Sequence, residues 1–180
     1  MSTPPTASVS SGELAVKSGA VTNRAVRPPQ LRLVLADKPV VALGLAVSYL
    51  MTKPAFASLR FGDLSRILVG QINRGHYRLA IDAKDEIQGF MGWALSSKER
   101  AEDWVQGRHA LAYDECLGGD CAILNAWAAN TGEVNRFMRV EGRKMLATYQ
   151  VKMIFARRYY PDGTLRPLRL GVTDFVGAHS

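Results

Sequence analysis

The residues HYRLAID (76–82) and IQGFMGWAL (87–95) decide the fold, because both stretches show a period of two. Alternation of apolar residues with polar or small ones is typical of a strand with one buried face. The charged residues 83–86 between the two stretches predict a turn. We therefore expect two consecutive strands of one sheet, with the rest of the chain packed around them.

The segment before these strands predicts two helices. Residues 40–51 are almost wholly apolar, so we expect a helix that is buried on most of its surface and is stopped by Pro54. Over residues 58–73 apolar side chains recur at helical spacing, and Gly75 follows, where a helix end favours a left-handed residue.

The segment after the strands predicts a mixture of elements. Ser96 or Ser97 can cap a short helix that runs to Gln106. The other patterns predict, in chain order, a strand over 109–116, a tight loop at 118–120, a helix over 122–129, a helical turn over 131–138, a strand over 144–160 and a turn at 161–163. The predicted fold class is α/β (α+β), with a mixed, mainly antiparallel sheet flanked by helices, two of them N-terminal.

A single folded domain is expected over residues 31–175. Residues 1–30 are rich in Ser, Thr, Pro, Ala and Gly and lack apolar periodicity, which predicts a disordered tail, and we expect residues 176–180 to be frayed. The apolar run over residues 39–51 is too short to span a bilayer as a helix. It begins too far into the chain for a signal sequence, so we expect a cytoplasmic protein.

The net charge of +7 is unevenly distributed. Residues 139–180 hold eight basic and three acidic side chains, whereas residues 39–138 hold ten and eleven. The excess therefore flanks a near-neutral core, and no recognition helix or aromatic RNA-binding pattern accompanies it. We expect no nucleic-acid partner; the basic excess indicates either another anionic partner or a solvated surface.

Several kinds of site are excluded by missing motifs. The chain has no P-loop, no dinucleotide-binding glycine pattern and no nucleophile elbow. Cys116 and Cys121 have no second pair to complete a metal site, and the three histidines show no metal spacing. We therefore expect no metal and two buried free thiols.

The most specific pattern lies between residues 93 and 120. Its motifs, in chain order, are Trp93-Ala94-Leu95, Glu102-Asp103-Trp104 with Gly107, Asp114, and Gly118-Gly119-Asp120. In order and spacing these motifs resemble those of the RTX-toxin-activating lysine acyltransferases, the hemolysin-activating protein C type. The resemblance covers roughly residues 40–155.

The resemblance implies a GNAT-like fold without the usual coenzyme A loop, and no bound cofactor. It implies transfer of a fatty acyl group from acyl-acyl carrier protein to internal lysines of an RTX-type protoxin, in the cytoplasm. The family's catalytic pair is a histidine and an aspartate. The aspartate falls on Asp114, but the histidine falls on Phe56, which cannot take a proton.

The missing histidine matters because a lysine ammonium, with a pKa of about 10.4, must lose a proton before it attacks a thioester. His76 is one alternative base; His109, on the same predicted strand as Asp114, would face the opposite way. Asp114 would itself serve if burial raises its pKa. The alternative function is a catalytically degenerate module that binds acyl carrier protein or another polypeptide, and a small-molecule acetyltransferase is disfavoured by the missing pyrophosphate loop.

Two further expectations concern binding. An apolar pocket near Phe56 and Trp93 would hold the acyl chain. Acyl carrier proteins are strongly acidic, so the basic residues Lys152, Arg157 and Arg158 would form the docking face. The oligomeric state stays open, with a homodimer as one option.

Overall fold

The computed structural model describes residues 30–160, 162 and 164–172, so the predicted tail (except Gln30) and the predicted frayed end lie outside the described residues. The elements, in chain order, are β1 (Arg32–Val34), α1 (Pro39–Leu50), α2 (Pro54–Ala57), α3 (Phe61–Asn73), β2 (Tyr77–Ile81), β3 (Ile87–Ser96), α4 (Lys98–Val105), the 3₁₀ helix η1 (Asp114–Cys116), β4 (Cys121–Ala129), α5 (Gly132–Thr148), β5 (Met153–Tyr159) and β6 (Leu165–Gly171).

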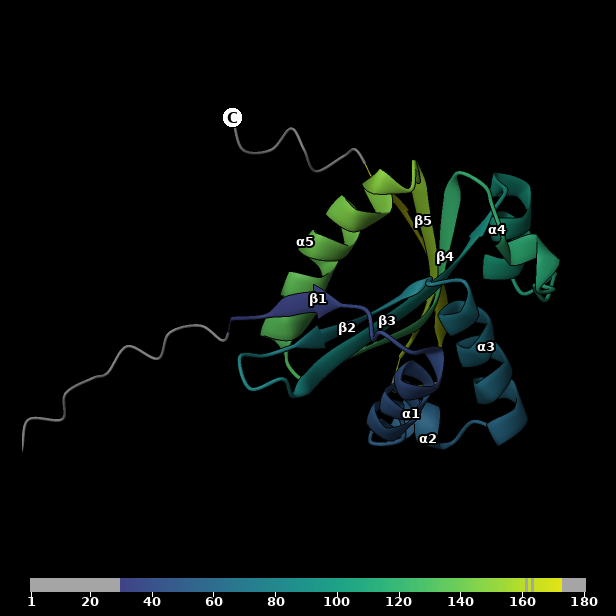
Figure 1. Ribbon diagram of the computed structural model, residues 1–180. Helices are drawn as coiled ribbons and strands as arrows, with labels where there is room; N and C mark the ends of the chain where they lie inside the picture. The colour runs from purple at the N-terminus through teal and green to yellow at the C-terminus, as the bar shows by residue number, and fades with distance from the viewer. Residues whose placement is uncertain (1–29, 161, 163, 173–180) are drawn as a thin grey trace, which may run out of the picture.

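The strands of the described residues form one six-stranded sheet in chain order, from β1 to β6 (Figure 1). Neighbouring strands run antiparallel, except that β4 and β5 run parallel. A parallel pair needs a crossover connection, and α5 supplies it. The predicted class, a mixed and mainly antiparallel sheet flanked by helices, is confirmed.

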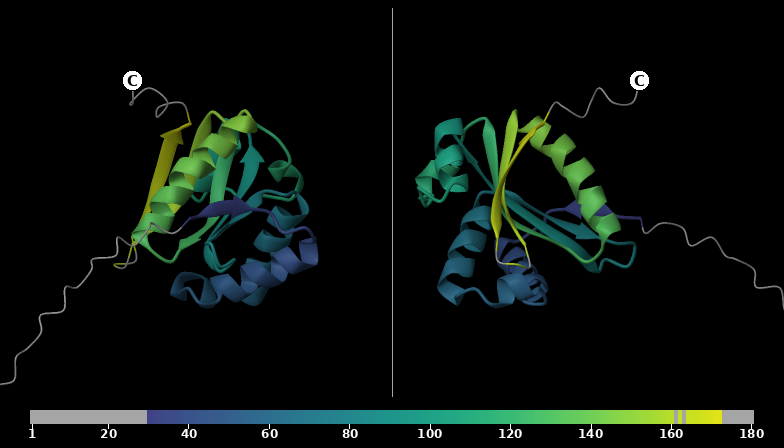
Figure 2. Two further views of the ribbon diagram at one scale, coloured as in Figure 1. Left: turned by 60° about the vertical axis from the view of Figure 1, so that its left-hand side comes forward. Right: turned by 180° about the vertical axis from the view of Figure 1, so that it is seen from behind.

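Helices cover both faces of the sheet. α5 lies on one face, and α1, α2 and α3 lie on the other, with α4 beside the far end of the same face (Figures 1 and 2). The side chains of β3 alternate accordingly: Phe90 packs in the cluster with α1 and α3, whereas Met91 packs under α5. Each such fully buried side chain stabilises the fold by about 2 kcal/mol, so both faces contribute to the core.

The predicted helix over residues 40–51 forms as α1, but its predicted burial on most of its surface is wrong. Ala42, Ala46 and Leu50 are fully buried, whereas Val40 is 75% exposed. The helix packs on α3 and the sheet from one side only, and apolar residues remain on its outer side. Pro54 does not end α1; it begins α2, where a missing N–H leaves no hydrogen bond unmade.

Two predictions near residue 120 are wrong. Residues 121–129 form the strand β4 and not a helix; most of this run is buried between the two helical layers, so it shows no clear alternation. Residues 109–116 form a loop that ends in η1 and not a strand. The predicted loop at 118–120 is present, and Gly119 (φ 133°) is required there because a Cβ would overlap the carbonyl oxygen of Ser96.

The predicted cap of α4 is confirmed, whereas the predicted end of the next helix at residue 138 is wrong. The hydroxyl of Ser97 accepts from Arg100 N–H at the start of α4, and that of Thr131 accepts from Val134 N–H at the start of α5. α5 continues to Thr148, so the predicted strand over 144–160 begins only at Met153. The buried residues of α5 recur every four positions, which is the helical signal that was missed: Val134, Met138, Gly142 and Leu146.

Candidate active site

The strands β4 and β5 separate part-way along their length. They pair only from Cys121 with Met153 to Leu124 with Ala156. Beyond this point β4 stays paired with β3 and β5 stays paired with β6, so the two strands diverge (Figure 2). Within the described strands, the facing edges beyond this point have no strand partner.

A bulge lies in β4 at the start of this opening. Gly92 pairs with Ala126 and Trp93 pairs with Leu124, so Asn125 has no partner on β3. One extra residue interrupts the ladder and redirects the side chains that follow it. The bulge therefore places Asn125 at the position where β4 leaves β5.

Gln71 of α3 meets the bulge from the helical layer. Its side chain is fully buried, and its Nε2 donates to Oδ1 of Asn125. Gly92 leaves the space for it, because a Cβ there would overlap the Gln71 amide. Oε1 of Gln71 is buried without a hydrogen-bond partner among the described residues. An unsatisfied buried acceptor costs about 1–3 kcal/mol.

Two arginines link the elements of this face. The guanidinium of Arg157 on β5 lies 4.4 Å from the Trp104 ring centroid and donates to the Trp104 carbonyl oxygen. The guanidinium of Arg74, which caps α3, lies 4.9 Å from the Tyr113 ring centroid. Both Nε atoms are buried and unpartnered among the described residues. The arginines fix α4 to β5 and the loop before η1 to α3.

His76 lies in an aromatic cluster. Its ring stacks on Trp93 at 5.7 Å and meets Tyr149 edge-on at 6.1 Å. Burial, assisted by the positive charges of Arg74 and Arg78, lowers the pKa of His76 to about 4. The ring is therefore neutral near pH 7, and its Nδ1 has no partner within the described part of the chain.

Asp114 is exposed in η1, directly after Tyr113. No hydrogen bond between described residues joins it to an imidazole, because Nε2 of His109 bonds to Glu115 at 2.7 Å and His76 is stacked on Trp93. The strand on which Asp114 was expected is absent. Its catalytic role and that of His76 stay predictions, as the two are not joined into a pair.

The single pocket expected around Phe56 and Trp93 is wrong. Phe56 packs against the cluster under α1 and α3, whereas Trp93 is fully buried in the cluster under α5. The sheet separates the two clusters, since the side chains of Phe90 and Met91 point to opposite faces.

The three residues expected to form the docking face make different contacts. Nζ of Lys152 pairs with Asp120 at 3.1 Å, and Arg157 is held on Trp104. Arg158 is exposed and lies 4.9 Å from the Tyr160 ring centroid, with Arg166 on the other strand 5.2 Å from the same ring. The docking role of Lys152, Arg157 and Arg158 stays a prediction, with Arg166 as a neighbour of Arg158.

Gln71 and Asn125 were missed by the sequence reasoning. Each is a single amide within an apolar pattern, Gln71 between Leu68 and Ile72 and Asn125 within β4. That polar interruption was the available signal, since a buried amide needs a partner.

The cysteines fit the expectation of buried free thiols, since Cys116 and Cys121 are both buried and unpaired. Burial raises the pKa of Cys121 to about 11, so it is a poor nucleophile at neutral pH. In the described ranges no group of three potential ligands could hold a metal ion. The helices of those ranges include none that is long and apolar enough to cross a membrane.

No protein-family model matches the sequence, and no curated protein is significantly similar to it. Solved structures with a similar chain path are acetyltransferases of the GNAT family. One from Staphylococcus aureus has a TM-score of 0.49 and 11% identity, covering 72% of this chain and 73% of its own. One from Listeria monocytogenes has a TM-score of 0.48 and 16% identity, and the match covers 73% of this chain and 78% of that chain. One from Escherichia coli, in complex with CoA, has a TM-score of 0.45 and 10% identity, and the match covers 78% of this chain and 81% of that chain. These likenesses are of overall chain path.

Proposed function

We propose that this protein transfers an acyl group from a thioester to an amine at the opening between β4 and β5. The observation that carries the proposal is the bulge at Asn125, which lies where the two strands separate and meets the buried amide of Gln71. A thioester carbonyl gains negative charge on oxygen when an amine attacks it. Fixed backbone N–H groups at an unpaired strand edge are suited to stabilise that charge.

The reaction forms an N–C bond and breaks the C–S bond. The amine loses one proton, the thiolate of the donor leaves with the electron pair of the C–S bond, and that thiolate takes up a proton. Gln71 is fully buried, so it would act through Asn125, whose side chain it holds at the opening. Asp114 would orient or activate the amine, in the role that the sequence resemblance implies for it.

An acyl carrier protein is the donor that we favour over coenzyme A. The N-terminus of α5, which follows β4, is capped by Thr131 and carries Glu133 in its first turn. A carboxylate there opposes the binding of a nucleotide pyrophosphate at this helix end. The exposed Arg158 and Arg166 lie on the hairpin that forms one wall of the opening, where an acidic carrier would meet positive charge.

Internal lysines of an RTX-type protoxin, modified in the cytoplasm, are the proposed acceptors. This part of the proposal rests on the sequence resemblance over residues 93–120. It is tested by incubating the chain with acyl-acyl carrier protein and an RTX-type protein, followed by intact-mass analysis. A mass gain of one acyl group on lysine supports transfer. No gain, while a relative with the family histidine succeeds in the same assay, contradicts it.

The substitution Gln71→Leu tests the site itself. It removes an unsatisfied buried acceptor but also the donor to Oδ1 of Asn125, so we expect the free energy of unfolding to fall by about 1–3 kcal/mol. We expect the transfer rate to fall about 10- to 100-fold, because Asn125 at the opening loses the donor that holds it. The matched control is Gln106→Leu at the exposed end of α4. An unchanged rate in Gln71→Leu would remove Gln71 from the mechanism.

A second candidate is a binding module without transferase activity. The observation that favours it is Phe56, which occupies the family's histidine position and packs against the core under α1 and α3. A chain that binds acyl carrier protein, leaves lysines unmodified and gains transfer on Phe56→His would be such a module.

A further inference from the structure

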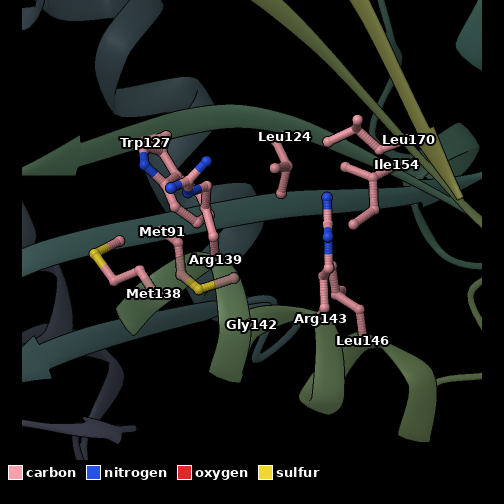
Figure 3. A pocket seen from close by; sticks show the side chains of 10 residues that line it. All are labelled: Met91, Leu124, Trp127, Met138, Arg139, Gly142, Arg143, Leu146, Ile154 and Leu170. Carbon is pink, nitrogen blue, oxygen red and sulfur yellow. The ribbon is translucent and has the colours of Figure 1, made fainter. Parts of the chain in front are cut away.

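Apolar side chains that the fold leaves uncovered are unequally divided between the two faces of the sheet. On the α5 side, the strands and the helix leave only a narrow apolar slot of about 40 Å³, lined among others by Leu124, Arg139 and Arg143 (Figure 3). A cavity of that size holds a few water molecules at most. The larger uncovered apolar surface lies on the opposite side of the sheet, over α1 and α3.

More than half of the large apolar side chains that are exposed in the described part of the chain lie between residues 40 and 69. They belong to α1, to α3 and to the turns beside α2: Val40, Val41, Leu45, Met51, Leu59, Phe61 and Val69. Phe61 and Val40 are the most exposed of them, at 76% and 75%. Figures 1 and 2 show α1, α2 and α3 together as a layer at the lower side of the molecule, away from α5.

The helix α1 is uncharged and has one side in solvent. Its 12 residues include no charged side chain. Val40, Val41, Gly44, Leu45 and Ser48 are exposed, and their spacing places them within one arc of the helix. A helix that is apolar all round is normally buried on every side. Within the described part of the chain, nothing covers the outer side of α1.

Basic side chains without ion pairs border this apolar surface. Lys38 precedes α1 as its N-cap, Arg60 precedes α3 in the same way, and Arg66 lies on α3; all three are exposed. No ion pair between described residues involves any of them. From Asp37 to the end of α3, four basic side chains oppose two acidic ones, Asp37 and Asp63. The border of the apolar surface is therefore net positive.

An anionic lipid surface matches this arrangement better than another protein does. A second copy in a symmetric contact would bring the same free cations of both chains to one interface, where they repel. A protein interface also carries about one hydrogen bond per 100–200 Å². The outer side of α1 offers only the hydroxyl of Ser48, whereas its backbone beyond the first turn is bonded within the helix, as an apolar medium requires.

We propose that α1 and the start of α3 dock on an anionic lipid surface. α1 lies along the boundary between headgroups and acyl chains, with its outer side and the Phe61 ring toward the acyl chains. The three basic residues without ion pairs meet the lipid phosphates. The docking is peripheral, since no helix of the described residues is long and apolar enough to cross a bilayer. It is independent of the transfer reaction.

Flotation of the full chain with vesicles tests the proposal. We expect binding to vesicles made of equal parts of phosphatidylcholine and phosphatidylglycerol, and little binding to phosphatidylcholine alone. Val40→Ser with Phe61→Ser should weaken binding about 10-fold or more, because both substitutions remove apolar surface that would enter the lipid. Both side chains are largely exposed, so the fold should persist, as urea denaturation checks.

The matched control is Leu165→Ser with Leu168→Ser, which removes exposed apolar side chains from β6 and should bind like the parent. Absence of binding to the anionic vesicles, or an equal loss in the two double variants, overturns the proposal. Self-association of the parent, or binding of acyl carrier protein, that Val40→Ser with Phe61→Ser abolishes without any vesicle binding assigns the surface to a protein and also overturns it.

Lys38→Gln with Arg60→Gln tests the contact with the headgroups. Each basic residue near an anionic bilayer strengthens binding about fivefold, so we expect a loss of about 25-fold at low salt and a smaller loss at high salt. The control, Arg136→Gln with Arg139→Gln on α5, removes the same charge from the opposite face and should change binding much less. An equal loss in both variants, or equally tight binding to uncharged vesicles, overturns the role of the basic residues.

The orientation on the lipid is tested with Phe61→Trp in anionic vesicles that contain bromine-labelled phosphatidylcholine. Bromine quenches indole fluorescence on contact, so we expect strong quenching of the added tryptophan. The control is Leu165→Trp on β6, where the added tryptophan should stay unquenched. Quenching of the tryptophan at residue 165 and not of that at residue 61 overturns the proposed orientation.

Discussion

Two neighbouring residues of β4 face opposite chemical environments. Asn125 meets the buried amide of Gln71 on the side of α3, whereas Leu124 lines an apolar slot on the side of α5. Side chains of a strand alternate between faces, and the bulge fixes which residue faces which side at the point where β4 leaves β5. One inserted residue in β4 thus places a polar group and an apolar slot back to back across the sheet.

The largest expected effect is on stability, and it comes from filling the space that Gly92 leaves for Gln71 on the α3 side of the sheet. Gly92→Ala places a Cβ on the fully buried Gln71 amide, which would have to break its hydrogen bond to Asn125 in order to move. We expect a loss of about 3 kcal/mol in the free energy of unfolding, measured by urea denaturation. The control is Gly44→Ala in α1, where a Cβ would meet nothing within 4 Å; it should stabilise the fold by about 0.5–1 kcal/mol. Equal effects of the two substitutions would show that the bulge is not tightly packed.

A somewhat smaller effect is the loss of stability in acid. We assign it to His76, which stacks on Trp93 on the α5 side of the sheet. The folded state takes up the His76 proton only near pH 4, whereas the unfolded chain takes it up near pH 6.5. The unfolded state therefore binds more protons between these values, and lowering the pH through this range favours unfolding.

We expect this histidine to lower the free energy of unfolding by about 2 kcal/mol between pH 6.5 and pH 4. His76→Phe keeps an aromatic ring on Trp93 and should show a shallower pH dependence over the same range. Urea denaturation at a series of pH values measures the slope. Identical slopes for parent and variant would mean that His76 is not the titrating group.

The smallest effect is on the rate of association with an acidic carrier. Arg158 and Arg166 lie directly opposite each other across β5 and β6, and like charges in such a pair repel. An anionic partner would relieve this repulsion. Arg166→Glu should slow association with acyl carrier protein severalfold at low salt and less at high salt, by stopped-flow measurement. Arg100→Glu, in α4, is the control for a general charge effect; an equal slowing in both variants would contradict a local docking face.

The parts of the fold that were predictable rest on local signals. The period of two over β2 and β3 and the caps at Ser97 and Thr131 act over a few residues, so they can be recognised without knowing the neighbours. The strand β4 was not predicted because its residues are largely buried between two helical layers. The sequence there shows neither the period of a strand nor that of a helix clearly. The pattern over residues 109–116 placed Asp114 on a strand that does not form.

The sequence by itself determined that the chain has two free thiols, two strands after two helical segments, and a basic C-terminal part. Only the tertiary structure decided that Gln71 meets Asn125, 54 positions away, that Phe56 and Trp93 lie in different clusters, and that Arg139 and Arg143 line a slot. The physical reason is that strand register and helix packing are fixed by burial summed over the whole domain. A sequence pattern reports the preference of a few neighbouring residues, and a bulge shifts that register by one position without leaving a local mark.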